Sequence, residues 1–127
     1  MDVTAKQPIT KPPHADCRAV SEILSRVGDK WTIQVVVSLM PGPQRFNGLK
    51  RNVSGISQQM LTRTLKTLER DGMVERVVHP STPPQVEYTL TRLGHSLAET
   101  SHQLALWAAA HQGEIADNRL QYDARAS

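Results

Sequence analysis

Several polar side chains that can hydrogen-bond to the edges of nucleic-acid bases lie within one short stretch of the chain. They are Ser57, Gln58, Gln59, Thr62, Arg63 and Lys66. A glutamine can form two hydrogen bonds with adenine, and Arg63 can reach guanine or a phosphate. Lys66 lies further along and fits a backbone phosphate, whereas Ser57 could serve only as a helix cap. This stretch is the first candidate for contact with DNA.

The basic residues are concentrated in the centre of the chain. The formal net charge of the 127 residues is +3, but residues 43–80 hold seven Lys or Arg against three Asp or Glu, while residues 94–127 hold two against four. Clustered positive charge favours a polyanionic partner. One Phe, two Trp and two Tyr are too few for a platform that stacks single-stranded bases. The composition therefore favours duplex DNA over single strands.

Cys17 is the one cysteine, so it cannot close a disulfide within the chain or build a cysteine-based zinc site. It stands at a predicted helix start, beside Arg18 and three residues after His14. This electropositive setting favours the reactive thiolate. The alternative is a buried, inert side chain, which is the common state of a free cysteine.

Apolar residues at helical spacing predict four helices in the first part of the chain. Their predicted spans are 16–28, 29–40, 47–53 and 57–71. Asp16, Asn47 and Ser57 stand at N-cap positions of the first, third and fourth of these helices. The second helix has apolar residues on most of its surface and should lie deep in the core. Gly72 ends the fourth helix.

After residue 73 the apolar residues alternate with polar ones, which predicts two strands at 74–79 and 86–90. Residues 80–85, with three prolines, join them as a hairpin. Thr91 then caps a final helix, rich in leucine and alanine, that ends near residue 116. Two helices with a glycine-containing turn followed by a hairpin predict a mainly α winged helix-turn-helix fold.

This fold extends the set of candidate DNA contacts. The first helix of the motif crosses the DNA backbone, which makes Arg45, Lys50 and Arg51 candidates for phosphate contact. The hairpin, or wing, offers Arg76 and His79. We assign residues 1–15 to a flexible N-terminal arm, 16–116 to the winged helix-turn-helix domain with dimerisation helices at both ends, and 117–127 to a flexible tail.

Five sequence blocks, in order, carry a family resemblance. They are residues 28–32, 42–49, 55–61, 68–74 and 86–91. Together they resemble the HxlR-type family of bacterial winged-helix transcription regulators, over roughly residues 17–112. The resemblance implies a homodimer that binds a palindromic operator. It also implies a sensor role for Cys17, because several members sense oxidants or electrophiles through a cysteine just before the first helix.

The remaining residues suggest no catalysis. We find no phosphate-binding loop, paired carboxylates or Ser/His/Asp set, and His95, His102 and His111 are not clustered with other metal ligands. We therefore predict no enzyme activity, cofactor or metal, and, without a long apolar run or signal peptide, a cytoplasmic protein.

The sequence favours a dimeric DNA-binding regulator, acting as a repressor and switched by oxidation or alkylation of Cys17, with a small thiol, oxidant or quinone as the reacting partner. The alternative is an adaptor that uses the winged-helix scaffold for protein contacts alone, without redox sensing. An adaptor would tend to carry apolar or acidic groups on its second motif helix. Gln58, Arg63 and Lys66 favour DNA instead.

Overall fold

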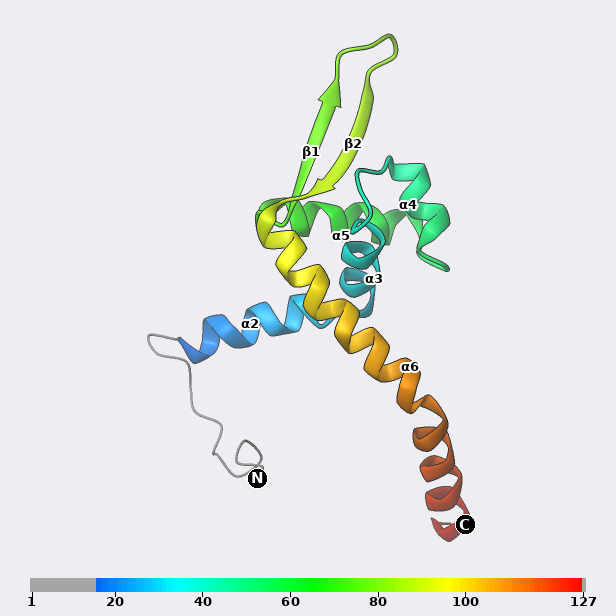
Figure 1. Ribbon diagram of the computed structural model, residues 1–127. Helices are drawn as coiled ribbons and strands as arrows, with labels where there is room; N and C mark the ends of the chain where they lie inside the picture. The colour runs from blue at the N-terminus through cyan, green and yellow to red at the C-terminus, as the bar shows by residue number, and fades with distance from the viewer. Residues whose placement is uncertain (1–15, 127) are drawn as a thin grey trace.

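A computed structural model describes residues 16–126 of the chain (Figure 1). Its helices and strands are α2 (Cys17–Val27), α3 (Lys30–Ser38), α4 (Phe46–Asn52), α5 (Gln58–Arg70), β1 (Val74–His79), β2 (Gln85–Leu90) and α6 (Arg92–Ala126). Each helix and strand expected between residues 16 and 116 is present. The predicted N-terminal arm, residues 1–15, lies outside the described residues.

The predicted N-caps of α2 and α5 are confirmed. The Asp16 carboxylate accepts a hydrogen bond from the Arg18 backbone N–H at 2.9 Å, and the Ser57 hydroxyl accepts one from the Met60 N–H at 3.0 Å. Each bond satisfies a backbone donor that the first turn of a helix leaves without a partner. The starts of α2 and α5 are thus encoded locally.

The predicted cap at Asn47 is wrong. Helix α4 begins at Phe46, its N-cap is Arg45, and no side chain makes a capping hydrogen bond there. The reason lies one residue earlier, where Gln44 forms a bridge with Tyr88 and the chain is extended as far as Arg45. The backbone enters the helix directly from this bridge, so Asn47 lies inside the first turn.

The core forms around α3, which packs against α2, α4, α5 and α6. Val35, Val36 and Leu39 are at most 1% exposed, as expected for a helix with little polar surface. Helix α5 contributes Leu61, Leu65 and Leu68 from one face, also at the predicted spacing. Burial of these side chains holds the helices together because it removes apolar surface from water.

The two strands form an antiparallel hairpin in which Val74 pairs with Leu90 and His79 with Gln85. The hairpin projects beyond α4 and α5 (Figure 1). Near its base, the Gln44 and Tyr88 backbones exchange hydrogen bonds of 3.0 and 2.8 Å, which ties the hairpin to the segment before α4. This isolated bridge lies two residues before the start of α4.

The last helix begins as predicted but ends later. The Thr91 hydroxyl accepts a hydrogen bond from the Gly94 N–H at 3.1 Å and donates one to the Gly72 carbonyl at 2.6 Å. Helix α6 then continues to Ala126, so the expected helix end near residue 116 is wrong. The segment assigned to a tail, residues 117–127, is therefore helical as far as Ala126. Residues 114–126 contain neither proline nor glycine, so no residue there interrupts the helix.

Helix α6 approaches the turn between α5 and β1 so closely that only glycine fits at position 94. A Cβ atom at Gly94 would overlap the Met73 carbonyl oxygen and meet the Leu90 side chain at 3.0 Å. Together with the Thr91 hydrogen bonds, this contact joins the end of α5, the start of β1 and the first turn of α6. The order of elements and their contacts form the predicted winged helix-turn-helix, with α4 and α5 as the motif and the hairpin as the wing.

Replacing Gly94 with alanine should lower the free energy of unfolding by about 1–3 kcal/mol, because the new methyl group would collide with backbone. Gly113→Ala is the matched control, since no atom lies within 4 Å of the added Cβ. Alanine there should be neutral or stabilising by about 0.5–1 kcal/mol, since it is the better helix former. Urea unfolding followed by circular dichroism measures both, and equal midpoints would contradict the close contact.

Candidate nucleic-acid interface

The outer face of α5 carries the proposed base-reading side chains together. An open groove along this helix is lined by Gln58, Gln59, Thr62, Arg63, Lys66 and Thr67. The opposite face is buried in the core through Leu61, Leu65 and Leu68. Because the core holds one face so firmly, the polar face is presented to solvent in a fixed orientation. All of the predicted α5 contacts except Ser57 lie in this groove.

Ser57 lies just before the groove. Its hydroxyl oxygen accepts the Met60 N–H, so the side chain has the capping role that the sequence left open. The hydroxyl hydrogen can still be donated to a phosphate. Ser57 therefore marks the start of α5, where the N-terminal residues of a helix-turn-helix reader meet DNA.

The basic residues around α4 do not all lie together. Arg45 and Arg51 line a second hollow, of about 480 Å³, together with Asn47 and Glu87. Lys50 is exposed but does not line this hollow. The structure therefore brings two of the three predicted phosphate contacts together and leaves Lys50 separate on the same helix.

The two wing candidates point to opposite faces of the hairpin, because side chains three residues apart on a strand alternate. The His79 ring Nε2 lies 2.8 Å from the Glu87 Oε1 atom across the hairpin, which engages this histidine with a carboxylate. Arg76 pairs in register with Tyr88 and lines a cleft against α5. Arg76 is thus close to α5, whereas His79 lies at the outer end of β1.

Gln44 connects the wing to the helices, a role that the sequence analysis missed. Its side-chain amide donates to the Ser38 carbonyl at the end of α3, and its side-chain oxygen accepts from Asn52 Nδ2 at 2.7 Å. Its backbone pairs with Tyr88. One residue therefore links α3, α4 and β2. No local sequence signal reveals this, since the partners lie on three different elements.

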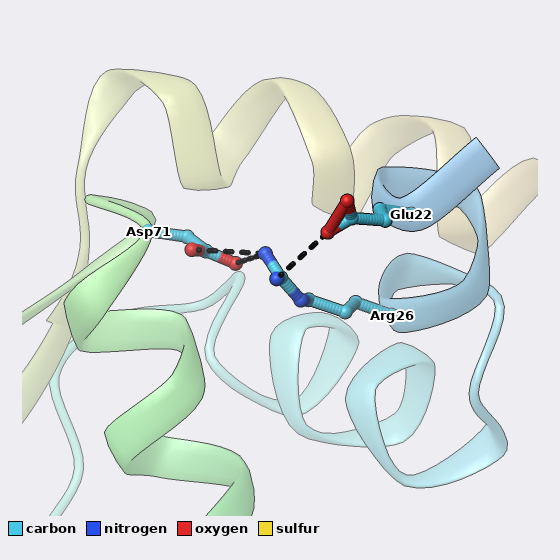
Figure 2. A network of polar contacts seen from close by, with 3 residues as sticks. All are labelled: Glu22, Arg26 and Asp71. Carbon is cyan, nitrogen blue, oxygen red and sulfur yellow. Dashed lines mark hydrogen bonds and ion pairs between the residues drawn. The ribbon is translucent and has the colours of Figure 1, made fainter. Parts of the chain in front are cut away.

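A second missed connection joins α2 to the end of α5. Arg26 Nη1 lies 3.5 Å from the Asp71 carboxylate, and Arg26 Nη2 lies 3.7 Å from Glu22 on its own helix (Figure 2). Asp71 is the C-cap residue of α5. The guanidinium thus bridges the helix that carries Cys17 and the helix whose side chains are predicted to contact bases. A separation of 45 residues hides this pair from sequence reasoning.

Cys17 is the first residue of α2 and is exposed to solvent. The structure thus does not support the alternative of a buried, inert cysteine. Arg18 follows it, and its backbone N–H is engaged by the Asp16 cap at 2.9 Å. His14, the other group predicted to act on this thiol, lies outside the described residues. The thiol is therefore accessible to a small oxidant or electrophile.

Large apolar side chains are exposed on α2 and α6. Ile23 and Leu24 are 50% and 63% exposed, and α2 has no buried residue. On α6 the exposed apolar side chains are Leu93, Leu104, Leu106, Trp107, Leu120 and Tyr122. Both helices extend away from α4, α5 and the hairpin (Figure 1). These apolar surfaces are separate from the polar groove on α5.

Among residues 16–126, no group of three or more His, Cys, Asp or Glu side chains is arranged to hold a metal ion. In that same range no helix is both long and apolar enough to cross a membrane.

Comparison with known proteins agrees with this geometry. Residues 26–116 match the family described as HxlR-like helix-turn-helix. The HTH-type transcriptional regulator YtfH of Escherichia coli is 38% identical over 94 residues, which cover 74% of this chain and 75% of that protein.

Solved structures of related regulators share the fold. The transcriptional regulator ytfH from Salmonella typhimurium matches with a TM-score of 0.73 at 36% identity, covering 79% of this chain and 89% of that one. The redox regulator HypR in its oxidized form matches with a TM-score of 0.67 at 37% identity, covering 72% and 95%. The chain therefore belongs to the HxlR-like helix-turn-helix family of transcriptional regulators.

Proposed function

We propose that this regulator binds a palindromic DNA operator as a homodimer, represses transcription, and is switched by oxidation or alkylation of Cys17. The observation that carries the DNA-binding part is the polar outer face of α5, whose groove gathers Gln58, Gln59, Thr62, Arg63 and Lys66. A helix of this kind reads bases when it lies in the major groove of DNA. Such a regulator acts on chromosomal DNA, which places it in the cytoplasm.

The basic residues outside α5 have a positioning role in this proposal. Arg45, Lys50 and Arg51 would contact phosphates along one side of the reading helix, and Arg76 and His79 would do so from the wing. Contacts to phosphate hold the helix in register but carry no sequence information. Since Arg45 and Arg51 share a hollow, they are suited to contact neighbouring phosphates. His79 would first have to leave its pairing with Glu87.

The exposed apolar faces of α2 and α6 support the homodimer. A soluble monomer rarely leaves large apolar patches uncovered, so these surfaces favour association with a second copy. A twofold dimer would present two α5 helices to two half-sites, about one turn of DNA apart. Association through α2 and α6 would keep the α5 grooves free for DNA.

The first prediction concerns α5. Arg63→Ala distinguishes the two contacts left open for this residue, guanine and phosphate. Contact with a base predicts that the variant binds the specific operator more weakly by about 1–3 kcal/mol, with little effect on unrelated DNA. Lys66→Ala should weaken binding to all sequences similarly and reduce the salt slope by about one, because Lys66 is assigned to a phosphate. Fluorescence anisotropy with DNA from upstream of its own gene measures both effects.

Arg70→Ala is the control for these variants, because Arg70 is exposed on the same helix and does not line the groove. It should bind DNA nearly as the wild type does. If Arg63→Ala and Lys66→Ala also bind normally at moderate salt, α5 is not the reader. Absence of any DNA binding by the wild type would favour a role in protein contacts.

The second prediction concerns the oligomer. Sedimentation should show a dimer at micromolar concentration, and Leu104→Glu should shift it toward monomer, because the charge would have to be buried at the interface. The leucine is 52% exposed in the chain alone, so the helix content should not change. Gln103→Glu adds the same charge at the neighbouring exposed position and should retain the dimer. A wild-type monomer would refute the proposal.

The third prediction concerns Cys17. Diamide should oxidise Cys17 to a disulfide, either with a small thiol or with Cys17 of a second subunit, with two electrons and two protons passing from the two thiols to diamide. A quinone should instead form a sulfur–carbon bond with the thiolate. Either change should release DNA. Cys17→Ser should bind the operator normally and be insensitive to both reagents.

An electrophoretic shift assay with and without each reagent tests this prediction. Mass spectrometry of the treated protein distinguishes the mixed disulfide, the quinone adduct and a disulfide between two subunits. A disulfide between two Cys17 residues would require their Cα atoms to lie about 4.4–6.8 Å apart in the dimer. If Cys17→Ser loses DNA in diamide as readily as the wild type, Cys17 is not the sensor.

A further inference from the structure

A cleft of about 480 Å³ lies between α5 and the base of the hairpin. Its main lining residues are Phe46, Leu65, Lys66, Glu69, Arg76 and Tyr88. They come from α4, α5, β1 and β2, all of which are held in place by the core or by strand pairing. The volume lies within the range of about 300–1,000 Å³ that is usual for small-molecule sites. The cleft is therefore a preformed site rather than a loop that must close.

The inner wall of the cleft is aromatic and apolar. Phe46 is the one phenylalanine of the chain and Tyr88 is one of two tyrosines, and both are half-buried against the core. Leu65 also lines the cleft but is buried in the core, at 2% exposed. The Tyr88 backbone is fixed by its hydrogen bonds with Gln44. Such a wall favours a flat apolar group, because rings pack well in offset or edge-to-face contact.

The rim of the cleft carries an excess of positive charge. Lys66 and Arg76 are exposed, and within residues 16–126 neither forms an ion pair with a carboxylate. Glu69 also lines the cleft, so its net charge is positive by one unit. An arginine beside a lysine suits a carboxylate, which can accept two hydrogen bonds from the guanidinium. Glu69 would repel a second negative charge on the same ligand.

We propose that this cleft binds a small aromatic monocarboxylate, with its ring against Phe46 and Tyr88 and its carboxylate between Lys66 and Arg76. Each half of the ligand matches one part of the site. A phosphate or acetate would leave the aromatic wall empty, and a neutral ring would leave the two cations to water. The ligand class is therefore a ring of one or two fused cycles with one negative charge.

Ligand binding in this cleft should affect DNA binding. This inference rests on the proposed DNA-binding function. Lys66 lines both this cleft and the groove on α5, and Arg76 is among the proposed phosphate contacts. A carboxylate that occupies these two cations competes with DNA phosphates for them. The bound ligand should therefore lower DNA affinity, independently of any change at Cys17.

Because Phe46 is the one phenylalanine, fluorine-labelled phenylalanine places a single NMR probe in the cleft. Naphthoate, added without DNA to the full chain at millimolar concentration, should shift this signal saturably. Naphthamide, which has the same ring and no charge, and acetate, which has the charge and no ring, should not. The absence of a saturable shift with naphthoate, or an equal shift with naphthamide, would overturn the proposal.

Substitution of the cation tests the site itself. Arg76→Gln should weaken naphthoate binding by about tenfold, the loss expected for charge-assisted hydrogen bonds. Arg70→Gln makes the same charge change on α5 at a residue that does not line the cleft, and it should leave the affinity unchanged. Circular dichroism checks that both variants are folded. Equal affinity of Arg76→Gln and the wild type would place the ligand elsewhere and refute the assignment.

Competition with DNA is measured separately, by fluorescence anisotropy with and without naphthoate. Cys17→Ser is used here so that oxidation of the thiol cannot contribute. DNA affinity should fall as naphthoate saturates the cleft. Naphthoate binding with no DNA binding at all would refute the proposed function and leave the cleft assignment intact, whereas DNA binding that saturating naphthoate leaves unchanged would refute the competition.

Discussion

The contact between Gly94 and the Met73 carbonyl is the constraint on which the arrangement of α5, the wing and α6 depends. Met73 lies in the turn that ends α5 and begins β1, and Gly94 lies in the first turn of α6. The absence of a side chain at Gly94 lets helix and turn meet backbone to backbone. The Thr91 N–H then donates to the Met73 carbonyl at 3.0 Å, while its hydroxyl contacts Gly72. The turn residues Gly72 and Met73 and the start of α6 therefore form one rigid unit.

This unit has two further supports, one on each side of α5. Gln44 holds the hairpin to the ends of α3 and α4, which restricts rotation of the wing relative to the helices. Arg26 reaches the C-cap of α5 from α2, although at 3.5 Å and with both side chains partly exposed the ion pair is weak by itself. The Arg26–Asp71 pair matters because of where it lies. It is a direct polar contact between the helix that bears Cys17 and the helix with the polar groove.

Local rules predict those parts of the fold that depend on neighbouring residues. Asp16, Ser57 and Thr91 each cap a helix with a hydrogen bond to a residue two or three positions ahead, and Gly72 adopts the positive φ expected after α5. The Asn47 cap is wrong because a distant strand pair sets where α4 begins. The end of α6 is missed because a helix continues wherever no glycine or proline ends it, and no particular residue marks the continuation. The groove on α5 follows from periodicity, whereas the cleft under the wing requires tertiary packing.

The surfaces of the molecule divide according to polarity. Polar and basic side chains gather on α5, around α4 and on the wing, while exposed apolar side chains gather on α2 and α6. A dimer built from the apolar surfaces would therefore leave the basic ones free, and any change in how α2 packs would act on α5 from its C-terminal end through Asp71. Gln58 and Gln59, which are proposed to contact bases, lie toward the other end of α5. A helix transmits such a displacement over its whole length, because its backbone hydrogen bonds make it stiff. Because the core holds α5, Gln58 and Gln59 would move only together with the whole helix.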